Sequence, residues 1–343
     1  MKKFTTFITL FLLVIFPLFA NGKKEETVQN QNKDFSILVY ISGNLAGSPP
    51  YQKLNDGALE FATKYENIKV KTYEAGYNQA EWESQLTSLV ATNQYDIVLT
   101  TNPSLSEICD NISKKFPNQK FLITDAYFTG NPNIATYEFN QYEQSYILGR
   151  LAAMIARSDL SGIRNTNKLG FVLSQEYPLI TEQTIPGLLD GAHSIDKSFE
   201  LDKRIIGNWY DADKAYELAN AMIDNGCDVL ATISGSASVG VLNSAKEKNA
   251  YIVFHDENIY AQAPGVVLGC GAMNQKELTL KILEDAYNNN INWGQAEVES
   301  ISSGYVDFFD KDPLFIKYLP ESIRLEFVSW LDKVRNGEII IEQ

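Results

Sequence analysis

Short apolar runs rich in β-branched and aromatic residues alternate along the chain with longer stretches whose apolar positions recur at helical spacing. In the first part, the runs predict strands at 35–41, 68–74, 95–100, 120–125 and 134–139, and the stretches between them predict helices at 51–65, 79–91 and 104–115. This alternation is typical of a parallel sheet with helices on both faces. We therefore predict that the first part folds as one α/β unit.

The alternation begins again after a long predicted helix at 141–157. Strands are predicted at 169–174, 199–207, 227–234, 250–255 and 265–273, with helices at 180–193, 211–224, 236–248 and 275–288. The last segment supplies only runs at 303–309 and 338–342 and a helix at 321–335, too few elements for a third domain. The pattern predicts an α/β protein of two doubly wound parallel-sheet lobes, between which the chain crosses more than once.

The length agrees with two domains, because a single core usually divides beyond roughly 250 residues and this chain has 343. We assign residues 34–139 plus 256–298 to an N-terminal lobe. Residues 140–255 plus 299–343 are assigned to a C-terminal lobe. Neither lobe is continuous in sequence under this assignment.

The N-terminus is predicted to be an export signal at residues 1–22. Lys2 and Lys3 precede an apolar run without charges that extends to Ala20, and a polar segment follows, which is typical of a secretory signal. The run of about 17 residues is at the low edge of what spans a bilayer, so an uncleaved signal anchor is the alternative. No cysteine lies near the predicted cut to carry a lipid anchor. We expect a protein exported to the periplasm or to the outer face of the cytoplasmic membrane.

The net charge and the cysteine content limit the kinds of partner, metal and cofactor that we expect. The net charge is −14, and an acidic surface repels phosphate backbones, so we expect no nucleic-acid partner. Cys109, Cys227 and Cys270 are odd in number and each lies in an apolar setting, which indicates buried thiols. No Cys or His spacing is typical of zinc. We expect no metal and no cofactor.

Ligands of open parallel sheets bind beyond the carboxyl ends of the strands. The segments that follow predicted strands are SGNLAGSPPY, TTNPS, TDAY, FNQYEQ, SQEYP, NWYD, SGSAS and HDENIY. Several of them combine small residues with an aromatic ring and an amide or a carboxylate. A cleft lined in this way suits a polar small molecule with a flat ring.

The segment HDEN is the one that most resembles a reaction centre. His255, Asp256 and Glu257 follow a buried strand, but a metal or hydrolytic site needs several converging ligands or a nucleophile, and no second histidine is placed for it. A solvated turn capped by Asp256 is a stronger alternative. A carboxylate at a strand end can also accept hydrogen bonds from two adjacent hydroxyls of a sugar.

Two aromatic residues are candidates for stacking against a ring. Trp209 can be a core residue as easily as a stacking surface, and Tyr51 is the matching candidate in the first lobe. SGSASVG lacks the glycine pattern of dinucleotide and phosphate loops and the G-x-S-x-G of hydrolases. Its small residues leave backbone N–H groups free for a helix cap or a ligand oxygen.

In this order, the segments resemble the basic membrane protein family, the purine-nucleoside-receptor-like substrate-binding proteins of bacterial ABC importers. The similarity runs through SGNLAGSPPYQKLNDGALEFA, FPNQKFLITDA, YEFNQYEQSYILGRLAAMIA, GNWYDADKAYELANAMIDNGCDVLATISGSASVGVLNSAKE, YIVFHDEN and GVVLGCGAMNQ. GSPPY, GYNQAEWE and TTNPS are similar to a spirochaete-type branch. The resemblance implies a type I periplasmic binding fold, two lobes joined by three crossings.

The resemblance also implies a ligand in the hinge cleft, with a base between two aromatics and a ribose held by an acid and a lysine. It places Tyr51 (or Pro50) and Trp209 at the positions of the two aromatic residues, Asp125 and Gly235 in the cleft, and Asp256 beside the ribose. The family lysine falls at Met273, with Lys276 one helical turn on, and His255 falls where relatives carry an apolar or aromatic residue. The full predicted set is Tyr51, Asn102, Asp125, Asn140, Gln141, Trp209, Gly235, Asp256 and Asn258.

From these observations we expect a monomeric solute-binding protein, not an enzyme, that closes its lobes on a purine nucleoside. Its expected partners are the permease and ATPase subunits of an ABC importer. The alternatives are a binding protein for a sugar or another heterocycle, a sensory receptor, and a metal-dependent hydrolase that uses His255, Asp256 and Glu257.

Overall fold

The computed structural model describes residues 34–46 and 48–343. The chain divides into two units, Met1–Lys33 and Asp34–Gln343, and only the second is described. The predicted export signal therefore lies outside the described residues. Within the described unit, no helix is long and apolar enough to cross a membrane.

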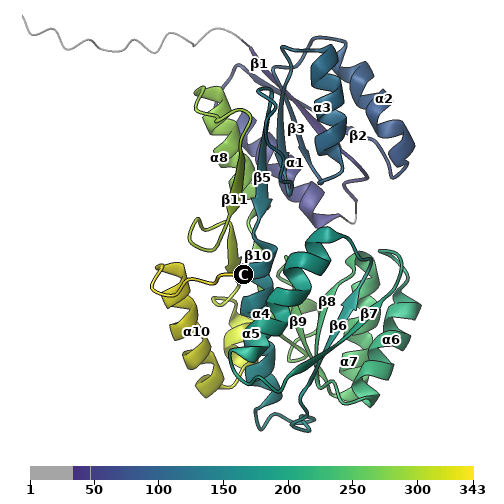
Figure 1. The fold of residues 1–343 in the computed structure, drawn as a ribbon, viewed down its shortest axis with the longest axis vertical. Helices are drawn as coiled ribbons and strands as arrows, with labels where there is room; N and C mark the ends of the chain where they lie inside the picture. The colour runs from purple at the N-terminus through teal and green to yellow at the C-terminus, as the bar shows by residue number, and fades with distance from the viewer. Residues whose placement is uncertain (1–33, 47) are drawn as a thin grey trace, which may run out of the picture. The chain divides into compact units, whose positions relative to one another are not determined.

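The N-terminal lobe is a six-stranded parallel sheet in the order β11-β5-β4-β3-β1-β2 (Figure 1). Its strands are β1 (Phe35–Ile41), β2 (Ile68–Glu74), β3 (Ile97–Thr101), β4 (Lys120–Thr124), β5 (Ile134–Phe139) and β11 (Ala296–Glu299). Its helices are α1 (Pro49–Ala62), α2 (Gln79–Val90), α3 (Leu105–Lys115) and α8 (Gln275–Tyr287).

Alternation along β1 explains why this sheet is covered on both faces. Ile37, Val39 and Ile41 belong to one buried cluster, whereas Leu38 and Tyr40 belong to another. The first cluster takes in residues of α1 and α8, and the second takes in residues of α2 and α3. A strand that is apolar on both faces must lie between two layers of helices, because successive side chains point to opposite sides.

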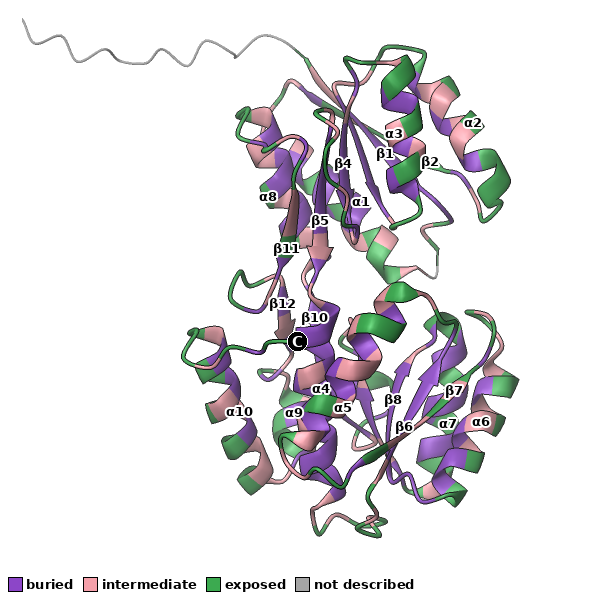
Figure 2. Ribbon diagram, in the orientation of Figure 1, coloured by how far each residue is buried: buried purple, intermediate pink, exposed green. Residues whose placement is uncertain are grey.

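The C-terminal lobe is a second six-stranded sheet in the order β12-β10-β9-β8-β6-β7. Its strands are β6 (Lys168–Leu173), β7 (Glu200–Ile205), β8 (Val229–Ile233), β9 (Tyr251–Phe254), β10 (Val267–Met273) and the antiparallel β12 (Val306–Phe308). Its helices are α4 (Gln141–Ala156), α5 (Ile185–His193), α6 (Ala212–Asp224), α7 (Ser238–Lys248), α9 (Pro313–Tyr318) and α10 (Glu321–Arg335). Shorter helical turns are η1 (Ile180–Thr184), η2 (Gly235–Ala237) and η3 (Tyr260–Gln262). Figure 2 shows that the inner strands of both sheets are buried while the helices keep exposed outer faces.

Helices α4 and α5 pack at very short range. A Cβ atom added at Gly149 of α4 would lie only 1.9 Å from the carbonyl oxygen of Leu188 on α5. Glycine is therefore required at this crossing, because any side chain would push the helices apart. The contact fixes the first helix of the C-terminal lobe, which begins directly after β5.

The chain passes between the two sheets three times: after Phe139, after Met273 and after Glu299. The two doubly wound lobes are as predicted, but one boundary differs. Residues 256–273 were assigned to the N-terminal lobe, whereas β10 pairs with β9 and β12 in the second sheet. An apolar run predicts a strand but does not say which sheet the strand joins, so the crossing at residue 273 was not visible in the sequence.

The predicted and observed elements also differ near the C-terminus. The run at 338–342 forms no strand, although Ile341 is buried, and the sequence did not predict β11 or α9. Strand β11 has only four residues with a polar pattern, AEVE. The three cysteines are buried free thiols, which confirms the prediction made for them.

Candidate ligand-binding site

Residues at the carboxyl ends of three strands have left-handed backbones. Asn102 after β3 has φ of 126°, Asp125 after β4 has φ of 53°, and Asp256 after β9 has φ of 69°. Non-glycine residues adopt such angles at a cost of about 1–3 kcal/mol, and strained positions cluster at binding sites. Gly235 after β8 also has a positive φ, 56°, without that strain. Four of the nine predicted site residues therefore lie at sharp backbone turns.

Asp125 and Asp256 come from different lobes and influence each other electrostatically. Burial raises the pKa of Asp125 to about 7, and the charges of Asp256 and Glu138 add to the effect. Burial and the charge of Glu257 raise the pKa of Asp256 to about 6, while Lys53 lowers it. Each residue is partly exposed as a whole, but its Oδ1 atom is buried without a hydrogen-bond partner. Two carboxylate oxygens that lack donors can accept hydrogens from a bound molecule.

Tyr51 belongs to a polar network beside Asp125. Its hydroxyl donates to the carbonyl of Ser42 at 3.2 Å and lies 3.1 Å from the Ser42 hydroxyl, to which Asn102 Nδ2 also donates at 3.3 Å. The ring packs on Gly43, where an added Cβ would lie 2.7 Å from Tyr51 Cε2. Burial raises the pKa of Tyr51, and Asp125 contributes to the rise. The structure thus brings Tyr51, Asn102 and Asp125 together at one sheet edge.

Trp209 presents its indole to solvent and is 40% exposed. Its carbonyl oxygen accepts hydrogen bonds from the Ser236 hydroxyl at 3.1 Å and from the Ala237 amide at 3.2 Å. A Cβ at Gly235 would lie 3.4 Å from the indole Cε3, so Gly235 allows the ring to lie against turn η2. An exposed indole with a fixed backbone can stack on a flat ring.

Tyr177 is a candidate site residue that the predicted set does not contain. It follows β6 in the segment SQEYP, is partly buried, and has its pKa raised by burial and then by the charges of Asp125 and Asp256. Its hydroxyl therefore lies within electrostatic range of both carboxylates. The segment SQEYP follows a predicted strand, and Tyr177 is its only aromatic residue, which is the signal that the sequence offers.

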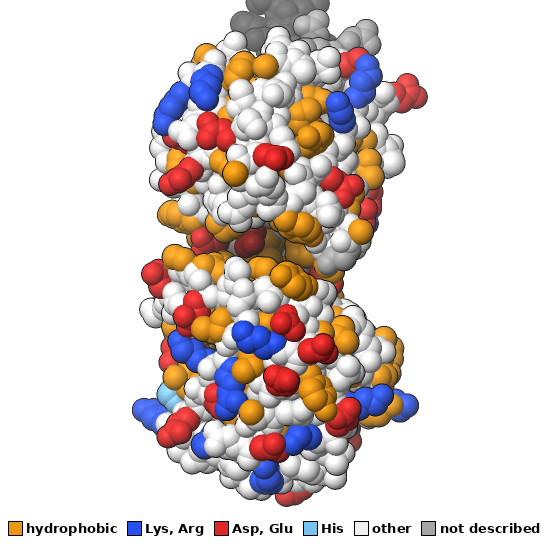
Figure 3. Space-filling model, turned by 90° about the vertical axis from the view of Figure 1, so that its right-hand side faces the viewer, with side chains coloured by type: hydrophobic (Ala, Val, Ile, Leu, Met, Phe, Trp, Pro, Cys, Tyr) orange, Lys and Arg blue, Asp and Glu red, His pale blue; other side chains and the backbone are white. Residues whose placement is uncertain are grey.

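Lys53 was also missed. Its Nζ lies 2.7 Å from Oε1 of Glu257, joining α1 of the N-terminal lobe to the loop after β9. A second contact between the lobes is the hydrogen bond from Gln183 Nε2 to Glu138 Oε1 at 2.8 Å. Figure 3 shows a hollow between the two lobes, bordered by acidic and hydrophobic side chains.

Three further predicted residues, outside the network of Tyr51 and Asn102, also have partners within the protein. Asn140 caps α4 by accepting a hydrogen bond from the Glu143 amide at 3.0 Å. Gln141 is buried and donates to Sδ of Met273 at 3.2 Å, and Asn258 donates to Asp312 at 2.8 Å. These contacts explain the side-chain positions without a ligand.

Lys276 forms its ion pair within the N-terminal lobe. Its Nζ pairs with Glu60 of α1 at 2.6 Å. The ammonium is therefore held between α8 and α1 within the N-terminal lobe.

His255 is a packing residue. It is 1% exposed, its ring stacks on Phe171 at 5.4 Å, and its Nε2 lies 3.0 Å from the Ser145 hydroxyl. Burial lowers its pKa to about 3, so the imidazole is neutral at physiological pH. In the described part of the chain, no group of three or more His, Cys, Asp or Glu side chains is arranged to hold a metal ion.

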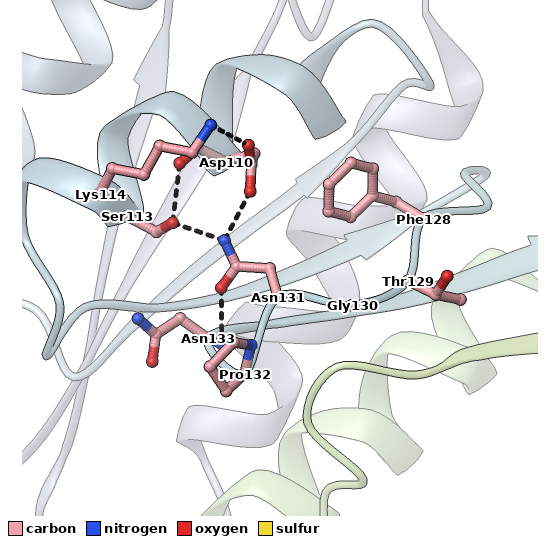
Figure 4. Close-up of a pocket in the computed structure, with 9 residues that line it drawn as sticks. All are labelled: Asp110, Ser113, Lys114, Phe128, Thr129, Gly130, Asn131, Pro132 and Asn133. Atoms are coloured by element: carbon pink, nitrogen blue, oxygen red, sulfur yellow. Dashed lines mark hydrogen bonds and ion pairs between the residues drawn. The ribbon is translucent and has the colours of Figure 1, made fainter.

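A separate surface pocket lies between α3 and the loop from β4 to β5 (Figure 4). Asn131 Nδ2 donates to Asp110 and to Ser113, both at 2.7 Å, and Lys114 pairs with Asp110 at 2.6 Å. The polar groups of this pocket are therefore paired with one another. It contains none of the predicted site residues.

Two doubly wound lobes joined by three crossings, with unpaired polar atoms at facing strand ends, define a two-lobed solute-binding protein. Residues 35–339 match the family described as ABC transporter substrate-binding protein, PnrA-like. The chain belongs to this family. Because the family is one of binding proteins, its members are not enzymes, and the resemblance to basic membrane proteins is confirmed.

Several curated relatives are similar to parts or all of the chain. The CD4+ T-cell-stimulating antigen of Listeria monocytogenes is 23% identical over 66% of this chain. The ABC transporter nucleoside-binding protein BmpA of Lactococcus lactis is 26% identical over 55% of it. These matches span 62% and 48% of the two relatives' own lengths. Basic membrane protein A1 of Borrelia garinii is 22% identical over 97% of this chain and 95% of its own length.

Solved structures agree with the fold. A transcriptional activator of the comK gene from Bacillus halodurans has a TM-score of 0.72 at 17% identity, covering 90% of this chain and 100% of its own. A solute-binding protein of an ABC transporter system from Aeropyrum pernix has a TM-score of 0.71 at 19% identity, covering 90% and 93%. These likenesses confirm the type I periplasmic binding fold.

Proposed function

We propose that this protein is exported, binds a purine nucleoside between its lobes and delivers it to the permease and ATPase of an ABC importer. The observation that carries the proposal is the pair of buried, unpartnered Oδ1 atoms of Asp125 and Asp256, which belong to different lobes. A ligand that donates hydrogens to both carboxylates stabilises only the form in which the lobes are together. It therefore shifts the population toward that form.

The aromatic residues support a flat ring as part of the ligand. The exposed indole of Trp209 offers a stacking face, while Tyr51 and Tyr177 lie near the carboxylates. A ring beside Trp209 and hydroxyls beside Asp256 match the two ends of a nucleoside. The names of the Lactococcus relative, a nucleoside-binding protein, and of a Brucella abortus relative, a purine-binding protein, favour the same ligand class.

Residues 23–343, the expected exported form, would test the proposal. Thermal shift and calorimetry with purine nucleosides, free purines, ribose and common sugars should give the largest response for nucleosides. Trp209→Ala should weaken binding by at least tenfold, because lost stacking is worth about 1 kcal/mol beyond lost area. Tyr210→Ala is the matched control, since Tyr210 is the adjacent aromatic and is 76% exposed.

Asp256→Asn tests the carboxylate, with the exposed Asp159→Asn as its control. Asp256→Asn should weaken nucleoside binding at least tenfold, because hydrogen bonds to a charged acceptor contribute about 1.5–3 kcal/mol. Nucleoside binding that survives both Trp209→Ala and Asp256→Asn would refute the site. A response to sugars without one to nucleosides would make this a sugar-binding protein.

A further inference from the structure

Gln144, in the first turns of α4, is a buried amide without a partner. The residue is 1% exposed, yet neither its Oε1 nor its Nε2 has a hydrogen-bond partner. An unpaired buried amide is destabilising, whereas an apolar side chain of the same size would carry no such cost. The residue therefore indicates a function other than packing.

The position of α4 directs this amide toward Asp256. The next residue, Ser145, lies 3.0 Å from Nε2 of His255, so this turn of α4 packs against the segment that contains His255 and Asp256. The amide of Gln144 also lowers the pKa of Asp256, although the two groups make no hydrogen bond of normal geometry. Gln144 and Asp256 are thus neighbours whose free polar atoms remain available.

Strand β10 leaves room for the side chain through a glycine. A Cβ added at Gly271 would lie 3.0 Å from Cγ of Gln144 and 3.4 Å from its Nε2. Even the smallest side chain at position 271 would therefore press on the amide. The glycine allows Gln144 to extend along β10.

The nearby cations are already paired. Lys53 is bound to Glu257 at 2.7 Å and Lys276 to Glu60 at 2.6 Å. Asp256 can only accept hydrogens when ionised. A donor that acts beside it on a ligand must therefore come from a neutral group, and Gln144 is the neighbouring amide with both atoms free.

We propose that Gln144 is a ligand-binding residue that, together with Asp256, selects a ligand with two adjacent hydroxyls, the cis-diol of a ribonucleoside. One ligand hydroxyl gives its hydrogen to Asp256 Oδ1 and accepts one from Gln144 Nε2. The second hydroxyl gives its hydrogen to Gln144 Oε1. This inference rests on the proposed nucleoside function and adds the feature by which the site distinguishes ribose from deoxyribose.

The test compares a purine ribonucleoside with its 2′-deoxy counterpart by calorimetry on residues 23–343. The unchanged protein should favour the ribonucleoside at least tenfold, because a site built for a hydroxyl leaves buried groups unpaired when the hydroxyl is absent. Gln144→Met, which keeps an unbranched side chain of similar size, should reduce that preference to less than threefold while the Tm of the ligand-free protein stays the same or rises. Gln79→Leu, at an exposed position on α2, is the control.

Gly271→Ala provides a second variant, which keeps the amide but displaces it. It should lower the preference for the ribonucleoside without abolishing binding of the deoxynucleoside. An unchanged preference in both Gln144→Met and Gly271→Ala, or no preference in the unchanged protein, overturns the role of Gln144 and leaves nucleoside binding intact. Failure of the unchanged protein to bind any nucleoside overturns the proposed function and this inference together.

Discussion

Nζ of Lys53 lies 2.7 Å from Oε1 of Glu257, and this ion pair joins helix α1 of the N-terminal lobe to the loop that follows β9 in the C-terminal lobe. Both side chains are mostly shielded from solvent, with exposures of 30% and 24%. Glu257 directly follows Asp256. The pair therefore holds the lobes together beside the proposed ligand without being part of the hydrogen-bonding set.

Loss of this pair is expected to favour the open form. Lys53→Met and Glu257→Gln should each weaken nucleoside binding about threefold, because a partly exposed ion pair contributes up to about 1 kcal/mol. The double variant should be no weaker than either single variant, and calorimetry of all four proteins measures the coupling. Additive effects would show that the two side chains act separately.

Asp125 is expected to make the ligand-free protein less stable as the pH rises. Its pKa is raised to about 7 by burial and by the charges of Asp256 and Glu138, so the folded state holds a proton that the unfolded state releases above about pH 4. The free energy of unfolding therefore falls between pH 4 and pH 7. Asp125→Asn should be more stable than the unchanged protein at pH 8, by a few kcal/mol at most, and nearly equal at pH 4.5.

Urea titrations at both pH values measure this difference. Asp159→Asn, at an exposed position, is the control variant. A pH-independent gain in Asp125→Asn would mean that its stability effect does not come from the ionisation of Asp125.

His255 is expected to act in the opposite direction. Burial lowers its pKa to about 3 from the ordinary 6.5, so the unfolded state binds a proton that the folded state does not. Stability is then full above pH 6.5 and falls on acidification toward pH 3, by about 2 kcal/mol at pH 5. His255→Gln keeps a hydrogen-bonding group for Ser145 and should flatten this fall in urea titrations. Nucleoside affinity at pH 7.5 should change less than twofold, and a large loss would make His255 a binding residue.

The alternation of strands and helices was sufficient to predict two doubly wound lobes, because strands such as β1 are apolar on both faces. It was not sufficient to place β10, whose sheet is decided by hydrogen bonds to β9 and β12. Strand β11 could not be predicted because AEVE contains no apolar run. The segment forms a strand by pairing with β5, some 160 residues earlier.

The strand-end rule and the resemblance together led to Asp125, Asp256 and Trp209, since strand ends can be read from the pattern. Gln144 and Tyr177 lie in the strand-end segments FNQYEQ and SQEYP but are not in the predicted set, and Lys53 lies just beyond SGNLAGSPPY. Gln144 lies in the polar first turns of α4 beside Gln141, Glu143 and Ser145, so it does not stand out in the sequence, and its neighbour Asp256 is distant along the chain. Whether such an amide is paired depends on tertiary contacts, which periodicity does not encode.

Gly235 offers a test of how firmly the indole of Trp209 must be held. The backbone there has φ of 56°, and an added Cβ would lie 3.0 Å from the carbonyl oxygen of Trp209 and 3.4 Å from its ring. Gly235→Ala should therefore cost about 1–2 kcal/mol in stability from backbone strain and should also displace the indole. Nucleoside affinity is expected to fall about tenfold, with indole fluorescence less perturbed by ligand. Gly304→Ala is the control variant. It introduces backbone strain at φ of 81°, but its added Cβ has no neighbour within 4 Å to displace. An equal loss of affinity in both glycine variants would mean that strain, and not the position of the ring, weakens binding.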